Sequence, residues 1–166
     1  MIEDGGFPFR IFHWRQGMGS PEDIRNRLVA IALEWQELFG VAPAITNAIS
    51  EFDAAVRLVG MTTDEYRCEC GPRTAVTRGH DFVFKGCRYQ IKANRPSGKP
   101  GSFVRIVGKP KNFDWDKLIW ILYDRNYVMQ EAWEWTVENY RAKFEFVERL
   151  SPAHMRQGSR IYPSPE

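Results

Sequence analysis

The sequence predicts an α/β fold in which a mixed β-sheet is flanked by helices. Apolar residues recur at helical spacing after Pro21, "LIWILY" (118–123) is a continuous apolar run of strand length, and "WTVENYRAKFEFVERL" (135–150) returns to a helical pattern. Helices before and after a group of strands are typical of layered α/β domains. At 166 residues the chain fits one domain with one core, so we treat residues 1–166 as a single domain.

Composition and the N-terminal sequence indicate the compartment in which the protein is expected to act. Apolar residues make up 43% of the chain and charged residues 27%, which leaves little room for long disorder. No stretch approaches the roughly 18 apolar residues of a membrane span. The start "MIEDGGFPF" lacks the basic and apolar parts of a secretion signal. We therefore expect a cytoplasmic protein that does not bind a membrane, while the net charge of +2 identifies no partner.

An irregular lead-in is predicted for residues 1–19, which show no period and pack through Phe7, Phe9, Phe12 and Trp14. A helix follows, because Ser20 is a capping residue, Pro21 suits the first helical position and Gly40 ends the pattern. The apolar residues at helical spacing in this helix are Ile24, Leu28, Ile31, Trp35 and Leu38.

A second helix is predicted over 46–59, closed by Gly60. Its apolar stripe comprises Ile49, Phe52, Val56 and Val59, with a flank of Ala48, Ala55 and Leu58. Glu51 falls on that flank, where a buried carboxylate needs a partner, so it is either a functional acid or an acid at the edge of a partly exposed helix. Asp53 falls on the polar side with Ser50 and Arg57, where it requires no special explanation.

The segment "HDFVFKGCRYQIKANR" predicts a β-hairpin. If Lys85 and Gly86 are the two central turn residues, Asp81 lies opposite Gln90 and the two share one face. Side chains alternate along a strand, so Lys92 shares the face of Gln90. The core-facing residues are then Tyr89, Ile91 and Ala93.

The remaining segments are assigned more simply. "MTTDEYRCEC" (61–70) has no defined element, and "DKLIWILYDRNYVMQEAW" (116–133) predicts two strands joined at "DRN". The first of these strands is apolar on both faces and so central in the sheet. Residues 135–150 predict a closing helix, and the tail 151–166 is left unassigned.

The three cysteines, Cys68, Cys70 and Cys87, cannot all pair within one chain, which favours a reducing compartment. With His80 they offer four positions for a zinc ion. Their C-x-C spacing is shorter than that of most structural zinc sites, so small buried thiols are the preferred interpretation.

The order of a helix with Glu51, a strand beginning at Asp81 and a hairpin ending in Gln-x-Lys resembles the PD-(D/E)XK nuclease superfamily. In some branches of that superfamily, including the Mrr-like restriction enzymes, Gln replaces the second acid. The segments "ISEFDAAVRLVGM", "GHDFVFKGCRYQIKANR" and "NFDWDKLIWILYDRNYVMQEAWEW" are also similar, in order and spacing, to a family of uncharacterised bacterial proteins assigned to that fold. The resemblance covers residues 46–140 and implies a restriction-endonuclease-like fold.

The resemblance also implies roles for individual residues. Asp81 would be the central metal ligand, Lys92 would orient or activate the attacking water, and Glu51 would be a supporting carboxylate. Gln90 stands where the second acid is expected, and a neutral amide is a weaker ligand for Mg²⁺ or Mn²⁺. Either Glu51 and the Ile91 carbonyl complete the coordination, or metal binding is weak and catalysis is lost. Taken without the resemblance, Asp81 and Lys92 could instead form a partly exposed salt bridge worth no more than about 1 kcal/mol.

A basic segment directly follows Lys92 and contains no acid from there to position 111. Its glycines and prolines predict a loop that leaves the sheet beside the candidate site. Lys and Arg side chains bind nucleic-acid phosphates without reading sequence, although a solvated surface loop is the simpler alternative. The candidate phosphate contacts are Arg95, Lys99, Arg105, Lys109 and Lys111.

Together these features predict a metal-dependent nuclease that hydrolyses phosphodiester bonds in DNA. One alternative is a nucleic-acid-binding module of the same fold without catalysis, and another is a partner-binding structural protein whose six tryptophans supply an interface. Cutting both strands of a duplex requires two sites and hence a two-fold homodimer. We place the dimer contact on the aromatic segment "WEWTVENYRAKFEF" (133–146).

Overall fold

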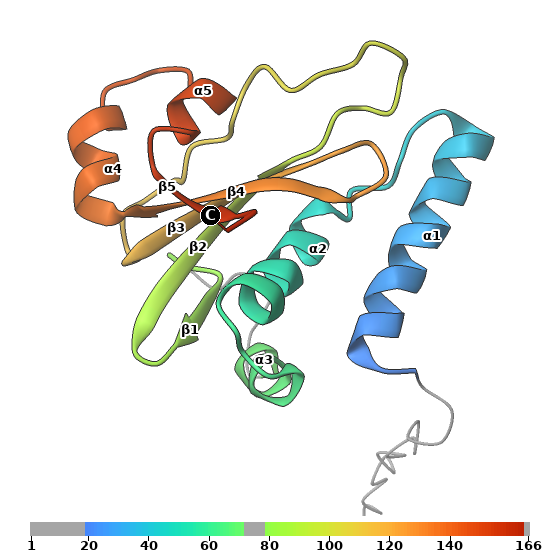
Figure 1. Ribbon diagram of the computed structural model, residues 1–166, viewed down its shortest axis with the longest axis horizontal. Helices are drawn as coiled ribbons and strands as arrows, with labels where there is room; N and C mark the ends of the chain where they lie inside the picture. Colours follow the sequence, from blue (N-terminus) through green and yellow to red (C-terminus); the bar gives the residue numbers. More distant parts are fainter. Residues whose placement is uncertain (1–18, 72–78, 165–166) are drawn as a thin grey trace, which may run out of the picture.

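The computed structural model describes residues 19–71 and 79–164 (Figure 1). Within those ranges, five strands form one sheet whose spatial order follows the sequence. β2 and β3 are parallel, whereas the other neighbouring pairs are antiparallel, so the sheet is mixed as predicted. The strands are β1 (Phe82–Phe84), β2 (Cys87–Asn94), β3 (Lys117–Tyr123), β4 (Met129–Thr136) and β5 (Ser159–Tyr162).

Helices lie on both sides of this sheet (Figure 1). One side carries α1 (Pro21–Phe39), α2 (Thr46–Phe52), the π-helix η1 (Asp53–Leu58) and α3 (Thr63–Cys70). The other side carries α4 (Val137–Phe144) and α5 (Pro152–Met155). The predicted α/β class, a mixed sheet flanked by helices, is confirmed.

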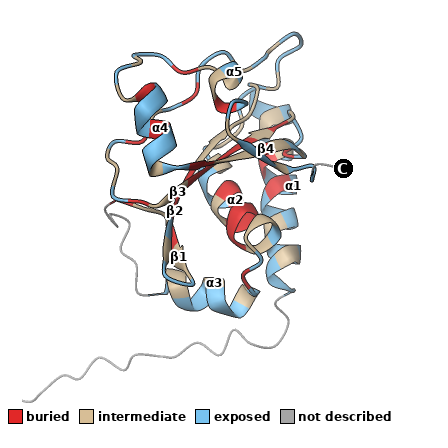
Figure 2. Cartoon of the chain, turned by 60° about the vertical axis from the view of Figure 1, so that its left-hand side comes forward, coloured by how far each residue is buried: buried red, intermediate tan, exposed pale blue. Residues whose placement is uncertain are grey.

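The central strand β3 is buried on both faces, which confirms the interpretation of "LIWILY". Ile119 and Ile121 belong to the core beneath α2 and η1, whereas Leu118 and Trp120 belong to the core beneath α4 and α5. Successive side chains of a strand point to opposite faces, so one apolar run serves both layers. Figure 2 shows the buried residues concentrated on the sheet and on α2.

The β1–β2 hairpin has the predicted register. Lys85 and Gly86 both have positive φ angles, 50° and 79°, as a tight two-residue hairpin turn requires. Phe82 pairs with Tyr89, and their rings stack with centroids 5.0 Å apart. Asp81 therefore comes to lie beside Gln90, at the end of the hairpin that is far from the turn.

The prediction for Asp53 was wrong, since its side chain is fully buried. Arg25 of α1 donates to both of its carboxylate oxygens, at 3.0 and 2.6 Å, and the Tyr123 hydroxyl donates to Oδ2 at 2.8 Å. Arg57 lies 3.3 Å from Oδ1. The helical pattern correctly placed Asp53 on a polar side of its helix. It could not show that α1 would cover this side and pair Arg25 with the carboxylate. The predicted helix 46–59 also changes to π-helical bonding at Asp53.

The aromatic segment 133–146 and the apolar stripe of α1 differ in burial. Within residues 133–146, Trp135, Tyr140 and Phe144 are buried and only Phe146 is strongly exposed, at 94%, so most of the aromatic surface predicted for a dimer contact belongs to the core. α4 ends at Phe144, earlier than predicted, because the chain turns to place Leu150 against Val107. By contrast, the apolar stripe of α1 is exposed, and that helix buries Val29 and Ala32 instead.

Three further segments differ from the sequence interpretation. Residues 63–70 form α3, begun by reciprocal hydrogen bonds between Thr62 and Glu65. The unassigned tail forms α5 and β5, and β5 extends the sheet at the edge of β4. The lead-in predicted for residues 1–19 lies, apart from Gly19, outside the described residues.

Candidate functional site

A polar cavity of about 300 Å³ lies where α2 packs on β2. Its lining includes Glu51 of α2, Asp81, which directly precedes β1, and Lys92 of β2. These are the three charged residues that the sequence interpretation expected to converge. The full lining comprises Asn47, Ser50, Glu51, Asp81, Ile91, Lys92, Ala93, Asn94 and Gly108.

The hairpin backbone holds the Asp81 carboxylate. Its Oδ2 atom accepts a hydrogen bond of 2.6 Å from the main-chain N–H of Ile91 and another from the side-chain amide of Gln90. The main-chain N–H of Asp81 in turn donates to the Tyr89 carbonyl at 2.7 Å. Both ends of this residue are thus tied to β2, which fixes the direction in which the carboxylate meets the cavity.

Gln90 is buried, and its side chain bonds to Asp81 and does not line the cavity as a metal ligand would. Its Nε2 atom donates to Asp81 and lies 3.4 Å from the Ile91 carbonyl oxygen. The amide therefore acts as a donor that orients Asp81, and Gln90 is not part of the cavity lining. A donor at this position bonds well to a carboxylate, whereas a second carboxylate here would repel the first unless a cation lay between them.

Further polar residues, which the sequence patterns did not assign to the site, complete the cavity. Asn47 and Ser50 precede Glu51 by four and one positions on α2, and the Ser50 hydroxyl donates to the Asn47 carbonyl at 3.0 Å. Residues four apart on a helix lie on one face, so the position of Asn47 relative to Glu51 was a usable signal. Gly108 reaches the cavity only through the folding of the loop, which no local pattern predicts.

The loop after β2 is attached to the body of the protein at several points. Asn94 links the sheet to this loop, because its amide oxygen accepts from Trp120 Nε1 at 2.9 Å while its nitrogen donates to the Ile106 carbonyl at 3.1 Å. The Lys109 ammonium donates to the carbonyls of Glu145 and Val147 at 3.1 and 2.9 Å. These bonds hold Gly108 at the cavity.

The five candidate phosphate contacts therefore fall into two groups. Arg95 and Lys109 serve the fold: the Arg95 guanidinium donates to the Arg125 carbonyl and to Gln36, and it lies 4.3 Å from the ring centroid of Tyr127. The exposed basic side chains that remain on this loop are Lys99, Arg105 and Lys111.

The donors around the cavity suit a hard cation only in part. Asp81, Glu51 and the Ile91 carbonyl are oxygen ligands of the kind that Mg²⁺ and Mn²⁺ bind. Two carboxylates are fewer than a cage of protein ligands would contain, and the described residues hold no group of three or more His, Cys, Asp or Glu suited to a metal. A cation at this cavity would therefore keep several water ligands, as Mg²⁺ commonly does.

The cysteines form no site of their own in the described ranges. Cys68 is exposed, and Cys70 and Cys87 are partly buried, so the expectation of small buried thiols was wrong for Cys68. Burial raises the pKa of the Cys87 thiol, which keeps it protonated and weakly reactive.

No protein-family model matches this sequence, and no curated protein is significantly similar to it. None of the helices in the described part of the chain has the length and apolar character that crossing a membrane requires. Function is therefore inferred from the chemistry of the cavity.

Proposed function

We propose that this protein is a metal-dependent nuclease of restriction-endonuclease-like fold that hydrolyses phosphodiester bonds, with DNA as its substrate. The observation that supports the proposal is the meeting of Asp81, Glu51 and Lys92 in one polar cavity at the end of a β-hairpin. Hydrolysis of a phosphodiester requires stabilisation of negative charge on the phosphate and an activated water. Two acids and a lysine around a space of this size meet that requirement.

Each residue has a defined part in this reaction. Asp81 and Glu51, with the Ile91 carbonyl, would hold Mg²⁺ or Mn²⁺, which would polarise the phosphate and lower the pKa of a bound water. The Lys92 ammonium would orient that water and stabilise the charge that develops on the phosphate. Gln90 would keep the Asp81 carboxylate pointing into the cavity through its hydrogen bond. Lys99, Arg105 and Lys111 would contact the DNA backbone beside the site.

The first test is cleavage of supercoiled plasmid and of linear duplex with Mg²⁺ or Mn²⁺. We expect the wild-type protein to cut, and Lys92→Met to lose at least about 100-fold in rate, because one transition-state contact is removed. Lys143→Met is the matched control, since Lys143 is an exposed lysine on α4, on the other side of the sheet. Equal rates for Lys92→Met and the wild type would remove the reaction from this cavity.

A second candidate function, DNA binding without cleavage, is favoured by one feature. The residue beside Asp81 is an amide that donates to it, where an active nuclease of this type usually carries another acid. Under this alternative the protein binds DNA in a salt-dependent manner but does not cut it with either metal. The two functions therefore share the basic loop and differ in the cleavage assay.

The basic loop is tested separately with Lys99→Ala, Arg105→Ala and Lys111→Ala combined in one variant. Each removes an exposed charge without disturbing the bonds that hold the loop, so DNA affinity should fall and its salt dependence should flatten. Arg95 and Lys109 are left intact because they anchor the loop. An unchanged affinity and salt slope would exclude this loop as the DNA contact, and no DNA binding by the wild type would favour the partner-binding structural alternative.

A further inference from the structure

α1 presents an apolar stripe to solvent. The exposed fractions are 42% for Ile24, 38% for Leu28, 57% for Ile31, 51% for Trp35 and 77% for Leu38. Single exposed apolar residues are common, but folded monomers rarely expose a contiguous row of this kind. Much of α1 is coloured as exposed or intermediate in Figure 2, although the helix lies on the body of the protein.

The spacing of this stripe is that of a coiled-coil seam. Its members follow one another at intervals of four, three, four and three residues. This alternation averages 3.5 residues and places the side chains in one row along the helix, which is the pattern by which two helices pack together. An adjoining side of α1 already packs on the protein through Val29 and Ala32. The seam is thus a second packing surface on the same helix.

The charges beside the seam distinguish between two ways of pairing it with a second copy. Arg27 and Glu34 are both exposed, stand one heptad apart and lie on the same side of the seam. In an antiparallel pair of identical helices, these equivalent positions face each other, so Arg27 of each chain meets Glu34 of the other. In a parallel pair they would face Ala32 and Phe39, and neither charge would gain a partner.

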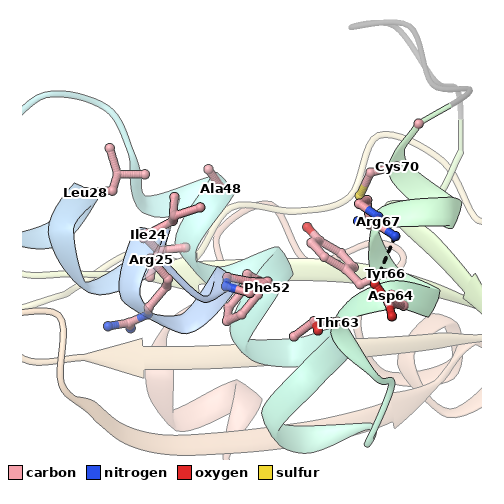
Figure 3. Close-up of a pocket in the computed structure, with 14 residues that line it drawn as sticks. Ile24, Arg25, Leu28, Ala48, Phe52, Thr63, Asp64, Tyr66, Arg67 and Cys70 are labelled. Carbon is pink, nitrogen blue, oxygen red and sulfur yellow. Dashed lines mark ion pairs between the residues drawn. The ribbon is translucent and has the colours of Figure 1, made fainter. Parts of the chain in front are cut away.

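The surface next to the seam is hollowed. An apolar groove of about 750 Å³ runs between α1, α2 and α3, with Ile24 and Leu28 on one wall, Tyr66 on the other and Phe52 between them (Figure 3). An antiparallel second copy brings the opposite end of its own seam, which carries Trp35, to this groove. Aromatic side chains are enriched in the buried centres of protein interfaces.

We propose that two copies of this chain associate through an antiparallel pairing of their α1 helices about a two-fold axis near Ile31. The stripe of each copy covers that of the other, the groove receives the aromatic end of the partner helix, and two equivalent Arg27 to Glu34 contacts set the direction. This proposal does not depend on the nuclease function. It places the interface on α1 and not on residues 133–146.

The test uses the full-length protein and measures molar mass over a range of concentrations by sedimentation or light scattering. We expect a concentration-dependent dimer that Ile31→Glu converts to a monomer. Ile106→Glu is the matched control, because Ile106 is as exposed as Ile31, at 59%, but lies on the loop after β2. A wild-type monomer, or a dimer that tolerates Ile31→Glu, would overturn the proposal. Coverage of the stripe by residues 1–18 of the same chain would give the first of these results.

A charge exchange tests the direction of pairing. Arg27→Glu and Glu34→Arg should each weaken the dimer about tenfold, since both replace two attractions by two repulsions. An equimolar mixture of the two variants should recover the wild-type affinity as a heterodimer, because every facing pair is again of opposite charge. Failure of the mixture to recover, or no effect of either change, would overturn the antiparallel arrangement.

Discussion

The carboxylates of Asp53 and Asp81 have different surroundings: the first is buried among protein partners, and the second borders a polar cavity. Asp53 is fully buried and is bonded to Arg25, Tyr123 and Arg57. Burial and the charge of Asp53 raise the pKa of the Tyr123 hydroxyl well above its usual value, so that hydroxyl stays protonated and donates. Asp81 is half-buried, is oriented by two donors on one oxygen, and borders a cavity with Glu51 and Lys92.

The difference shows that burial of a charge is a poor guide to where chemistry takes place. The more buried acid is surrounded by cations and a hydroxyl from the protein itself, so no space is left for a substrate. The less buried acid is held by the hairpin but reaches a space of about 300 Å³. We therefore assign stability to Asp53 and the candidate reaction to Asp81.

The strongest test of this division is Asp53→Ala. Removing the acid leaves Arg25 as a buried charge without its partner, and the Tyr123 hydroxyl loses its acceptor, so unfolding free energy should fall by about 3–5 kcal/mol. Urea unfolding measures this loss. Asp64→Ala provides the contrast, since Asp64 forms an exposed pair with Arg67 and its loss should change stability by less than about 1 kcal/mol. Similar effects of the two substitutions would contradict the structural role of Asp53.

The opposite result is expected for Asp81→Asn. The asparagine can still accept from the Ile91 N–H, so stability should change by no more than about 1 kcal/mol. Cleavage should fall by about 100- to 1,000-fold, because the charge that would bind the metal and stabilise the transition state is gone. Measuring unfolding and cleavage on the same variant separates the two effects. Substantial cleavage by Asp81→Asn would assign the chemistry elsewhere.

Gln90→Glu sharpens the comparison, because it places a second carboxylate beside Asp81, whereas the neighbours of Asp53 are cations and a hydroxyl. The substitution replaces a donor by an acid beside the Asp81 carboxylate, so without metal the protein should lose about 1–3 kcal/mol of stability. Mg²⁺ or Mn²⁺ would relieve that repulsion and should raise the melting temperature of this variant more than that of the wild type. Gln130→Glu, at an exposed position on β4, is the control. Equal metal responses of Gln90→Glu and the wild type would argue against a cation here.

The smallest expected change in stability concerns a third acid, Asp116. It directly precedes β3 and is hydrogen-bonded to Arg88 of β2. The Arg88 side chain and main chain donate to it, which lowers the pKa of Asp116 to about 2. The stabilisation of the folded state by the ionised Asp116 carboxylate is fully present above the ordinary pKa of about 4 and is lost as the pH falls toward 2. Asp116→Asn should therefore flatten the acid side of the stability profile slightly, as measured by unfolding at several pH values. Arg88→Gln should do the same, and a steeper profile in either variant would contradict this account.

Local chemistry made much of the fold and of the site predictable. The capping residues of α1, the positive-φ turn at Lys85 and Gly86, and the doubly apolar "LIWILY" each depend on near neighbours in the chain. The hairpin register was sufficient to place Asp81 beside Gln90, whereas Gln90 does not line the cavity that Asp81 shares with Lys92 and Glu51.

Other features depend on contacts between distant segments, which no local pattern records. The sequence determined that α1 is amphipathic and that the helix with Glu51 has a polar side, but not which surfaces would be covered. Only the tertiary structure brought Arg25 onto Asp53 and left the stripe of α1 exposed. It also buried Trp135, Tyr140 and Phe144 and used Arg95 and Lys109 to anchor their loop. The physical reason is that periodicity reports which residues share a face, whereas burial depends on what that face meets. That depends in turn on pairings such as Arg25 with Asp53, whose members lie 28 positions apart in the chain.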